Sequence, residues 1–324
     1  MSNAYSGVAT SGDTTALSPA LLAVYSADIE HNAQSIMRFH EFVVEKEELT
    51  KQPGESITFT TYADIDGGGE LTETDDLETK AMSASTDSIS VTEYGNAIGV
   101  REKLLQLSYD DVLEEAAVLL GRNYAKVVDT TIRDAYLGAS STIYAGARAS
   151  RAALKGGTDY FDVEVIRVAV ETLDTAEAPK FFVDGDEFYV CFLHPHASAY
   201  LKRDPDWVAA NNYANTRRLF TGELGRWEDV IFISTTHMLN GAAATTHAGY
   251  SASLADAATG GSSNADVYQS VIFGDNAVGR AIALPVEMRD NGVQDFGRKH
   301  GLAWYSIEGF DILNDDHIVV VESV

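Results

Sequence analysis

Apolar positions along the chain follow helical spacing in some segments and alternate with polar positions in others. Residues 1–17 are small and polar, which indicates an arm. Ser18 and Pro19 suit the cap and first position of a helix, and apolar residues then recur at helical spacing to about residue 39. We therefore expect an N-terminal arm and helix over residues 1–40.

Between residues 55 and 100, apolar and polar residues alternate along the chain instead of following helical spacing. In "SITFTTYADI", Ile57 and Phe59 fall on one face of a half-buried strand, with Thr58 and Thr60 on the other. Strand character returns in "SISVTEYGNAIGVRE". The roughly twenty residues between are acidic and rich in Gly and Thr, and so long a loop in a compact domain is usually functional. The pattern predicts an extended β-loop over residues 55–100.

The strongest helical pattern covers residues 108–138. Acidic residues crowd its start and basic ones come later, as the helix dipole favours, and Gly138 supplies its end. At 1.5 Å per residue the helix is on the order of 40 Å long. Its predicted apolar stripe includes Leu113, Leu120, Tyr124 and Val128.

Shorter elements follow. A second helix is predicted from about Phe161 to Thr175, and Pro195 starts another. The runs "EFYVCFLHP" and "VIFIS" are continuously apolar, as in strands buried on both faces. The composition of residues 240–265 predicts a flexible insertion. The final "GFDILNDDHIVVVES" reads as strand, acidic turn and strand, which predicts a C-terminal β-hairpin.

Composition limits the class of protein. The chain has 324 residues, is 45% hydrophobic and carries a formal charge of −26, so it folds but repels nucleic acid unless its basic residues cluster. The first hundred residues supply half of this excess, with 17 acidic and 4 basic residues. There is no signal-peptide pattern or membrane-length apolar run, so we expect a soluble protein made in the cytoplasm. The lone Cys191 lies in an apolar strand and predicts a buried free thiol.

Candidate chemistry is sparse. No catalytic or nucleotide-binding motif is present. His194 and His196 could share a face and bind a metal, or simply flank the start of a helix at Pro195. The basic cluster Arg148, Arg151 and Lys155 could touch phosphate, or could be ordinary helix-flanking surface.

The acidic loop allows a further reading. Its carboxylates alternate as in a calcium loop, but Gly68 occupies the fifth position, where an oxygen ligand is needed. A solvated acidic loop is the alternative to a calcium site. The carboxylates concerned are Asp64, Asp66, Glu70, Asp75 and Asp76.

Four segments, taken in order, resemble the major capsid protein of tailed bacteriophages, whose fold is shared with encapsulins and the floor of herpesvirus capsids. They are "VTEYGNAIGVREKLLQLSYDD", "GELGRWEDVIFISTTHM", "VYQSVIFGDNAVGRAIAL" and "WYSIEGFDILNDDHIVVVES". The resemblance covers nearly the whole chain. It implies an α+β tailed-phage capsid fold in which residues 41–160 and 271–324 form a peripheral domain, with the extended loop 55–100 and a spine helix 108–138. Residues 161–270 would form a central axial α/β domain containing the insertion 240–265.

The resemblance also implies a function. The chain would be a structural protein, not an enzyme, with no cofactor or metal. Its copies would assemble as hexamers and pentamers into an icosahedral shell that encloses packaged double-stranded DNA without reading its sequence. Scaffolding, portal and decoration proteins would be partners, with assembly in the host cytoplasm, location in the virion and no membrane contact. Alone, the extended loop is a marginal β-ribbon, so we expect it to contact a neighbouring copy. The expected contact residues are Tyr62, Ile65, Leu71, Leu77 and Met82.

Three alternatives remain open from the sequence. An encapsulin-like compartment would have the same fold and an enzyme as cargo. A tail or adhesion protein would bind calcium in the acidic loop. A hydrolase would carry catalytic residues dispersed along the chain, without a recognisable motif.

Overall fold

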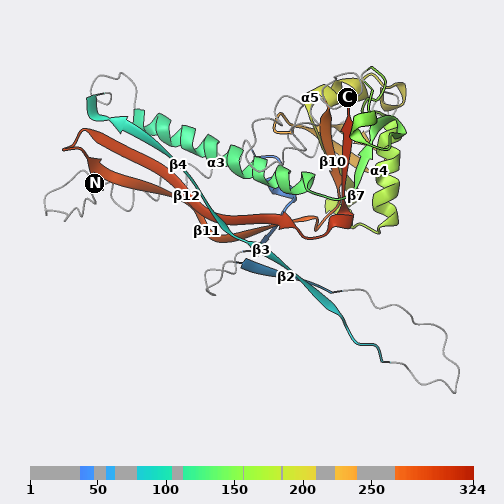
Figure 1. Ribbon diagram of the computed structural model, residues 1–324, viewed down its shortest axis with the longest axis horizontal. Helices are drawn as coiled ribbons and strands as arrows, with labels where there is room; N and C mark the ends of the chain where they lie inside the picture. Colours follow the sequence, from blue (N-terminus) through green and yellow to red (C-terminus); the bar gives the residue numbers. More distant parts are fainter. Residues whose placement is uncertain are drawn as a thin grey trace. The chain divides into compact units, whose positions relative to one another are not determined.

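The computed structural model describes residues 37–46, 56–62, 79–103, 112–155, 157–183, 185–208, 223–238 and 267–324 (Figure 1). Within these ranges the α-helices are α3 (Val112–Leu137), α4 (Val163–Thr175) and α5 (Pro195–Leu201). Short 3-10 helices are η1 (His40–Phe42), η3 (Ala145–Ala147), η4 (Arg151–Ala153) and η6 (Asp315–His317). The strands are β1 (Val44–Lys46), β2 (Ser56–Tyr62), β3 (Ala84–Ser90), β4 (Thr92–Arg101), β5 (Thr142–Tyr144), β6 (Phe181–Val183), β7 (Asp186–Leu193), β8 (Glu223–Trp227), β9 (Val230–Ser234), β10 (Tyr268–Phe273), β11 (Val278–Gln294), β12 (Lys299–Ile312) and β13 (Ile318–Ser323).

The chain divides into two compact units, each built from distant segments of sequence. The first unit comprises residues 1–40, 92–129 and 283–308, and the second comprises residues 41–91, 130–282 and 309–324. The predicted division into a peripheral and an axial domain refers to positions within a shell, and it stays a prediction.

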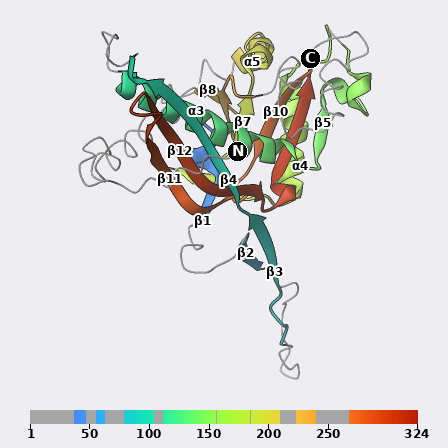
Figure 2. The same ribbon diagram turned by 60° about the vertical axis from the view of Figure 1, so that its left-hand side comes forward.

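In the first unit, α3 lies along strands β4 and β12 (Figures 1 and 2). Strand β12 pairs antiparallel with β4, from Lys299 opposite Arg101 to Glu308 opposite Thr92. Alternate residues of β12 are buried, and Trp304 among them is 1% exposed. Its indole N–H donates to the Asn123 side chain of α3 at 3.0 Å.

The predicted long helix is confirmed as α3, while residues 104–111 lie outside the described residues. Of its predicted stripe, Leu120, Tyr124 and Val128 are buried. The side chain of Leu113 lies outside the described part. The Tyr124 ring meets Trp304 edge-on at 5.3 Å between centroids, and its hydroxyl donates to the buried Glu308 carboxylate at 3.0 Å. One face of α3 is therefore fixed by aromatic packing and hydrogen bonds to β12.

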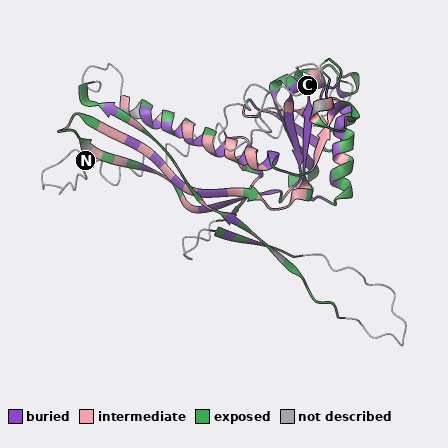
Figure 3. Ribbon diagram, viewed as in Figure 1, coloured by how far each residue is buried: buried purple, intermediate pink, exposed green. Residues whose placement is uncertain are grey.

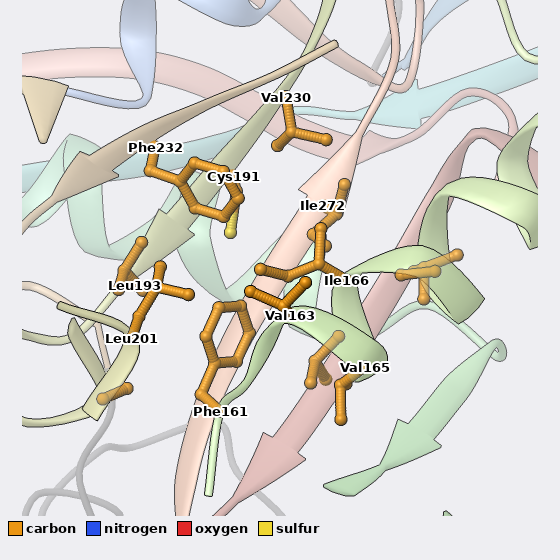
Figure 4. Packing of buried hydrophobic residues seen from close by; sticks show 14 of the residues in the cluster. Phe161, Val163, Val165, Ile166, Cys191, Leu193, Leu201, Val230, Phe232 and Ile272 are labelled. Atoms are coloured by element: carbon orange, nitrogen blue, oxygen red, sulfur yellow. The ribbon is translucent and has the colours of Figure 1, made fainter. Parts of the chain in front are cut away.

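The second unit contains a seven-stranded sheet in the order β5-β13-β10-β7-β9-β8, with β6 paired to β7. Helices α4 and α5 cover one face, where their apolar side chains pack on the sheet (Figure 4). Asp162 caps α4 by accepting the Val165 N–H at 3.1 Å. The six residues of β7 from Phe188 to Leu193 are all buried, which confirms the strand predicted from the apolar run. The buried free thiol of Cys191 is confirmed as well.

Aromatic rings cover the opposite face of this sheet. Phe42 meets Phe192 and Phe273 edge-on at 5.6 and 6.1 Å. The Tyr136 hydroxyl donates to the Phe42 carbonyl at 2.9 Å, and its ring lies 4.4 Å from that of Phe273. The segment of β7 from Phe188 to Leu193 is apolar because both faces of its sheet are covered there.

The predicted C-terminal hairpin is wrong. Strand β12 belongs to a four-stranded sheet, order β1-β11-β12-β4, whereas β13 lies between β10 and β5 in the seven-stranded sheet. The acidic turn redirects the chain, because the Asn314 side chain accepts the Asp316 N–H at 3.1 Å and Asp315 accepts the Ser140 N–H at 2.9 Å. A turn and two strands in sequence do not reveal which sheet each strand joins.

Candidate assembly interface

The predicted extended loop forms a two-stranded ribbon where the structure describes it. Strands β2 and β3 pair antiparallel, from Ile57 opposite Ile89 to Tyr62 opposite Ala84. Ile57 and Phe59 are buried while Thr58 and Thr60 are exposed, as alternation predicted. The ribbon is therefore buried near its base and exposed farther out (Figure 3).

A small apolar cluster holds the base of the ribbon. Ile57, Phe59, Ile89 and Ala281 form its buried centre, and partly buried neighbours, including Leu313, pack against it. The cluster joins β2 and β3 to β11. Burial of Ile57, Phe59 and Ile89 stabilises the contact by about 1.5–3 kcal/mol each, relative to leaving these side chains exposed.

Two glycines allow the strands at the base to approach closely. A Cβ atom at Gly309 would lie 2.2 Å from the Ser90 carbonyl oxygen, and one at Gly279 would lie 2.8 Å from the Ile89 side chain. Neither glycine has a positive φ, so the requirement is for space rather than for a special backbone conformation.

Beyond its base the ribbon exposes large apolar side chains. Tyr62 is 63% exposed and Met82 is 67% exposed. The other predicted contact residues, Ile65, Leu71 and Leu77, lie outside the described residues. The contact role of all five stays a prediction. An isolated two-stranded ribbon is marginally stable in water, so one that exposes apolar side chains has reason to gain partners.

The two candidate metal ligands are placed together, but as part of a helix start. The rings of His194 and His196 are nearly parallel at 5.2 Å, and His194 Nδ1 accepts the His196 N–H at 3.3 Å. Burial lowers the pKa of His194, and the neighbouring His196 lowers it further. Within the described ranges no three His, Cys, Asp or Glu side chains converge on a metal position.

The basic cluster forms internal ion pairs. Arg148 donates to both carboxylate oxygens of Asp159, at 2.7 and 3.1 Å, and Arg151 pairs with the buried Glu322. The Lys155 backbone N–H donates to Asp159 at 2.8 Å. Sequence reasoning missed these partners, although a glutamate within the apolar final strand could have indicated a buried pair. The two arginines therefore brace the fold.

The acidic carboxylates considered for calcium all lie outside the described residues. A shallow hollow of about 470 Å³ lies beside α4, with Glu171 and Asp316 among its lining residues. Its other lining side chains are aliphatic or threonine, and none is a histidine, cysteine or lysine that could pair with these carboxylates. None of the helices within the described ranges combines the length and hydropathy that a membrane crossing needs.

Comparisons with known proteins agree with this geometry. The model of a family described as "Phage capsid protein" matches residues 10–314. No curated protein sequence matches the chain. Among solved structures, the capsid of Ralstonia phage GP4 is similar, with a TM-score of 0.70, 16% identity, and 89% of this chain and 91% of that chain covered.

Two further solved structures are also similar. The Cyanophage Pam1 capsid has a TM-score of 0.65 and 15% identity, covering 91% of this chain and 92% of that one. The head of Helicobacter pylori bacteriophage KHP40 has a TM-score of 0.63 and 15% identity, covering 87% and 86%. The predicted α+β tailed-phage capsid fold is confirmed.

Proposed function

The chain belongs to the phage capsid protein family, and from this premise we propose that its copies build the closed icosahedral shell of a tailed phage. The family is one of structural virion proteins, and we assign this member no catalytic role. The observation that carries the proposal is the β2–β3 ribbon, which is held firmly at its base and exposes Tyr62 and Met82 farther out.

A neighbouring identical copy would cover the parts of the ribbon that are exposed in a single chain. Laid on a neighbouring subunit, its strands gain partners for their open edges and its apolar side chains leave water. The proposed contacts are Tyr62 and Met82, together with Ile65, Leu71 and Leu77 from the segment between the strands. Such a contact joins two different surfaces, and it closes into a ring when the rotation from one copy to the next is a whole fraction of a turn. The proposed rings are the hexamers and pentamers of an icosahedral shell.

Weak individual contacts are sufficient for a shell. Each subunit makes several contacts at once, and simultaneous contacts multiply the strength of association without any single strong interface. In this arrangement residues 41–160 and 271–324 would be peripheral in the ring and residues 161–270 would be axial.

The charge of the chain suits enclosure of DNA without sequence-specific binding. A net charge of −26 repels phosphate, which keeps packaged DNA from adhering to the wall. A scaffolding protein, a portal and decoration proteins are the further partners that we propose for such a shell.

Deletion of residues 66–80 tests the ribbon contact. Sedimentation velocity should show large particles for the wild-type chain, expressed with or without a scaffolding protein, and mostly small species for the deletion variant. Circular dichroism should show both to be folded, because the deletion removes no residue of β2, β3 or the buried base.

A matched deletion of the same length, residues 246–260 in the predicted insertion, serves as the control and should leave particle yield near that of the wild type. Wild-type yield from the 66–80 deletion would contradict the ribbon contact. A wild-type chain that stays monomeric under all these conditions would contradict the shell function itself.

A further inference from the structure

The turn between β11 and β12 holds a phenylalanine entirely in solvent. Phe296 is 106% exposed, which is the largest value among the exposed large apolar side chains of the described residues. A phenylalanine is ordinarily at least partly covered, and a large apolar side chain left in water is a feature of surfaces that bind a partner.

The backbone adopts an uncommon conformation to hold the ring there. Asp295, Phe296 and Gly297 all have positive φ, at 54°, 56° and 91°. Glycine adopts such values freely, but a bulky residue such as phenylalanine rarely does, and residues held in this region cluster at functional sites. An asparagine in place of Phe296 would fit this backbone more easily.

Hydrogen bonds keep the turn in this form. Arg298 folds back on the Asp295 carboxylate, at 2.9 Å from Nη2 and 3.2 Å from Nε. The Arg298 N–H donates to the Gln294 carbonyl at 3.1 Å, and its own carbonyl accepts the Glu102 N–H at 3.1 Å. The ring is therefore presented by a braced turn, so little conformational freedom would be lost on binding.

The charge around the turn differs from that of the whole chain. Residues 290–299 and the adjoining residues 101–103 hold four basic and three acidic side chains, a net charge of +1, whereas thirteen residues at the average charge of the chain would carry about −1. This end of the hairpin is thus suited to an acidic surface. It carries too little positive charge to bind DNA.

We propose that Phe296 anchors this turn on the acidic surface of a second copy of the chain. The inference rests on the proposed shell function, which surrounds each subunit with copies of net charge −26. The contact joins the turn of one copy to a different surface of the next, because two such turns would oppose like charges. The ring supplies the buried apolar centre and the charged residues form its rim.

Substitution Phe296→Asn tests this anchor, with particle formation followed by light scattering over a range of protein concentrations. The threshold concentration for assembly should rise about 10-fold or more, as for a central interface residue. The melting temperature of the unassembled chain should be unchanged or slightly higher, since asparagine suits the positive φ. The variant Phe296→Leu retains an apolar side chain, so its threshold concentration for assembly should lie between those of the wild type and Phe296→Asn.

Phe182→Asn is the matched control, because Phe182 is also exposed, at 69%, but lies on β6 of the other unit. Its threshold should stay within about 3-fold of the wild type, as most surface residues contribute little. The inference alone would be overturned if Phe296→Asn assembled at the same threshold concentration as the wild type. It would also be overturned if Phe296→Asn and Phe182→Asn raised that threshold equally. A wild-type chain that never assembles would overturn both the inference and the shell function.

Discussion

At the scale of single residues, the chain pairs several of its scarce basic side chains with carboxylates inside the fold. It has 23 lysines and arginines against 49 acidic residues. Arg148 and Arg151 nevertheless pair with Asp159 and Glu322, which are almost fully buried. A buried carboxylate without its cation would be strongly unfavourable, so these pairs hold separate segments in one arrangement.

Asp159 offers the clearest test of such a pair. The Arg148 guanidinium, with help from the Lys155 N–H and the Thr158 hydroxyl, lowers the pKa of Asp159 from 3.8 to about 2. Because the pKa is lowered in the folded state, the carboxylate contributes stability above pH 3.8 and loses it as the pH falls toward 2. The contribution is about 2 kcal/mol.

We expect Asp159→Asn to lower the free energy of unfolding by about that amount at pH 6, as measured by urea denaturation. The difference in free energy of unfolding between the variant and the wild type should decrease between pH 4 and pH 2, where the wild-type carboxylate becomes protonated. Asp311→Asn, at an exposed position on β12, is the control, and its difference in free energy of unfolding from the wild type should not decrease in this way. A constant difference across this pH range would contradict the assigned role of the ion pair.

At the scale of elements, the base of the ribbon depends on a close approach between β3 and β12. The Ser90 carbonyl occupies the space that a side chain at Gly309 would need. Even one methyl group there must displace backbone, which has no alternative rotamer to adopt.

Gly309→Ala should therefore destabilise the chain by about 2 kcal/mol or more and loosen the ribbon. Urea denaturation gives the first quantity, and hydrogen exchange of residues 56–62 and 84–90 gives the second. Gly99→Ala is the matched control within a strand, because a Cβ there would meet no atom within 4 Å. It should change stability by less than about 0.5 kcal/mol. Equal effects of the two substitutions would refute the close-approach argument.

Elements with a strong period were predictable from the sequence. The apolar stripe through Leu120 and Val128 predicted α3, and the alternation around Ile57 and Phe59 predicted the half-buried ribbon. In both cases the spacing of the apolar residues shows which face of the element is buried. The continuous apolar run in β7 likewise indicated a strand that is buried on both faces. These patterns are local, so nearby residues contain the information.

Features that depend on distant partners were not predictable in this way. Strand β13 was expected in a hairpin, but it pairs with β10 and β5 because its apolar residues suit any covered sheet. Arg151 and Glu322 are 171 residues apart, and nothing in either local sequence identifies the other. Phe296 was not singled out, since one apolar residue in a turn has no period and its exposure depends on backbone conformation.

At the scale of the whole molecule, a single copy leaves surfaces uncovered that further copies can cover. The ribbon exposes Tyr62 and Met82, the β11–β12 turn exposes Phe296, and the acidic charge keeps free copies soluble. Because several modest contacts form together, assembly should depend steeply on concentration and should end when the shell closes. The capsid family of the chain and the geometry of its exposed segments support the same account.

A structure of the assembled particle, determined by single-particle electron microscopy, tests the central claim most directly. The account predicts hollow closed shells in which residues 56–90 of each copy extend over a neighbouring copy, with Tyr62 and Met82 buried between them. Particles in which that ribbon contacts only its own chain, or a preparation that contains no shells, would contradict it.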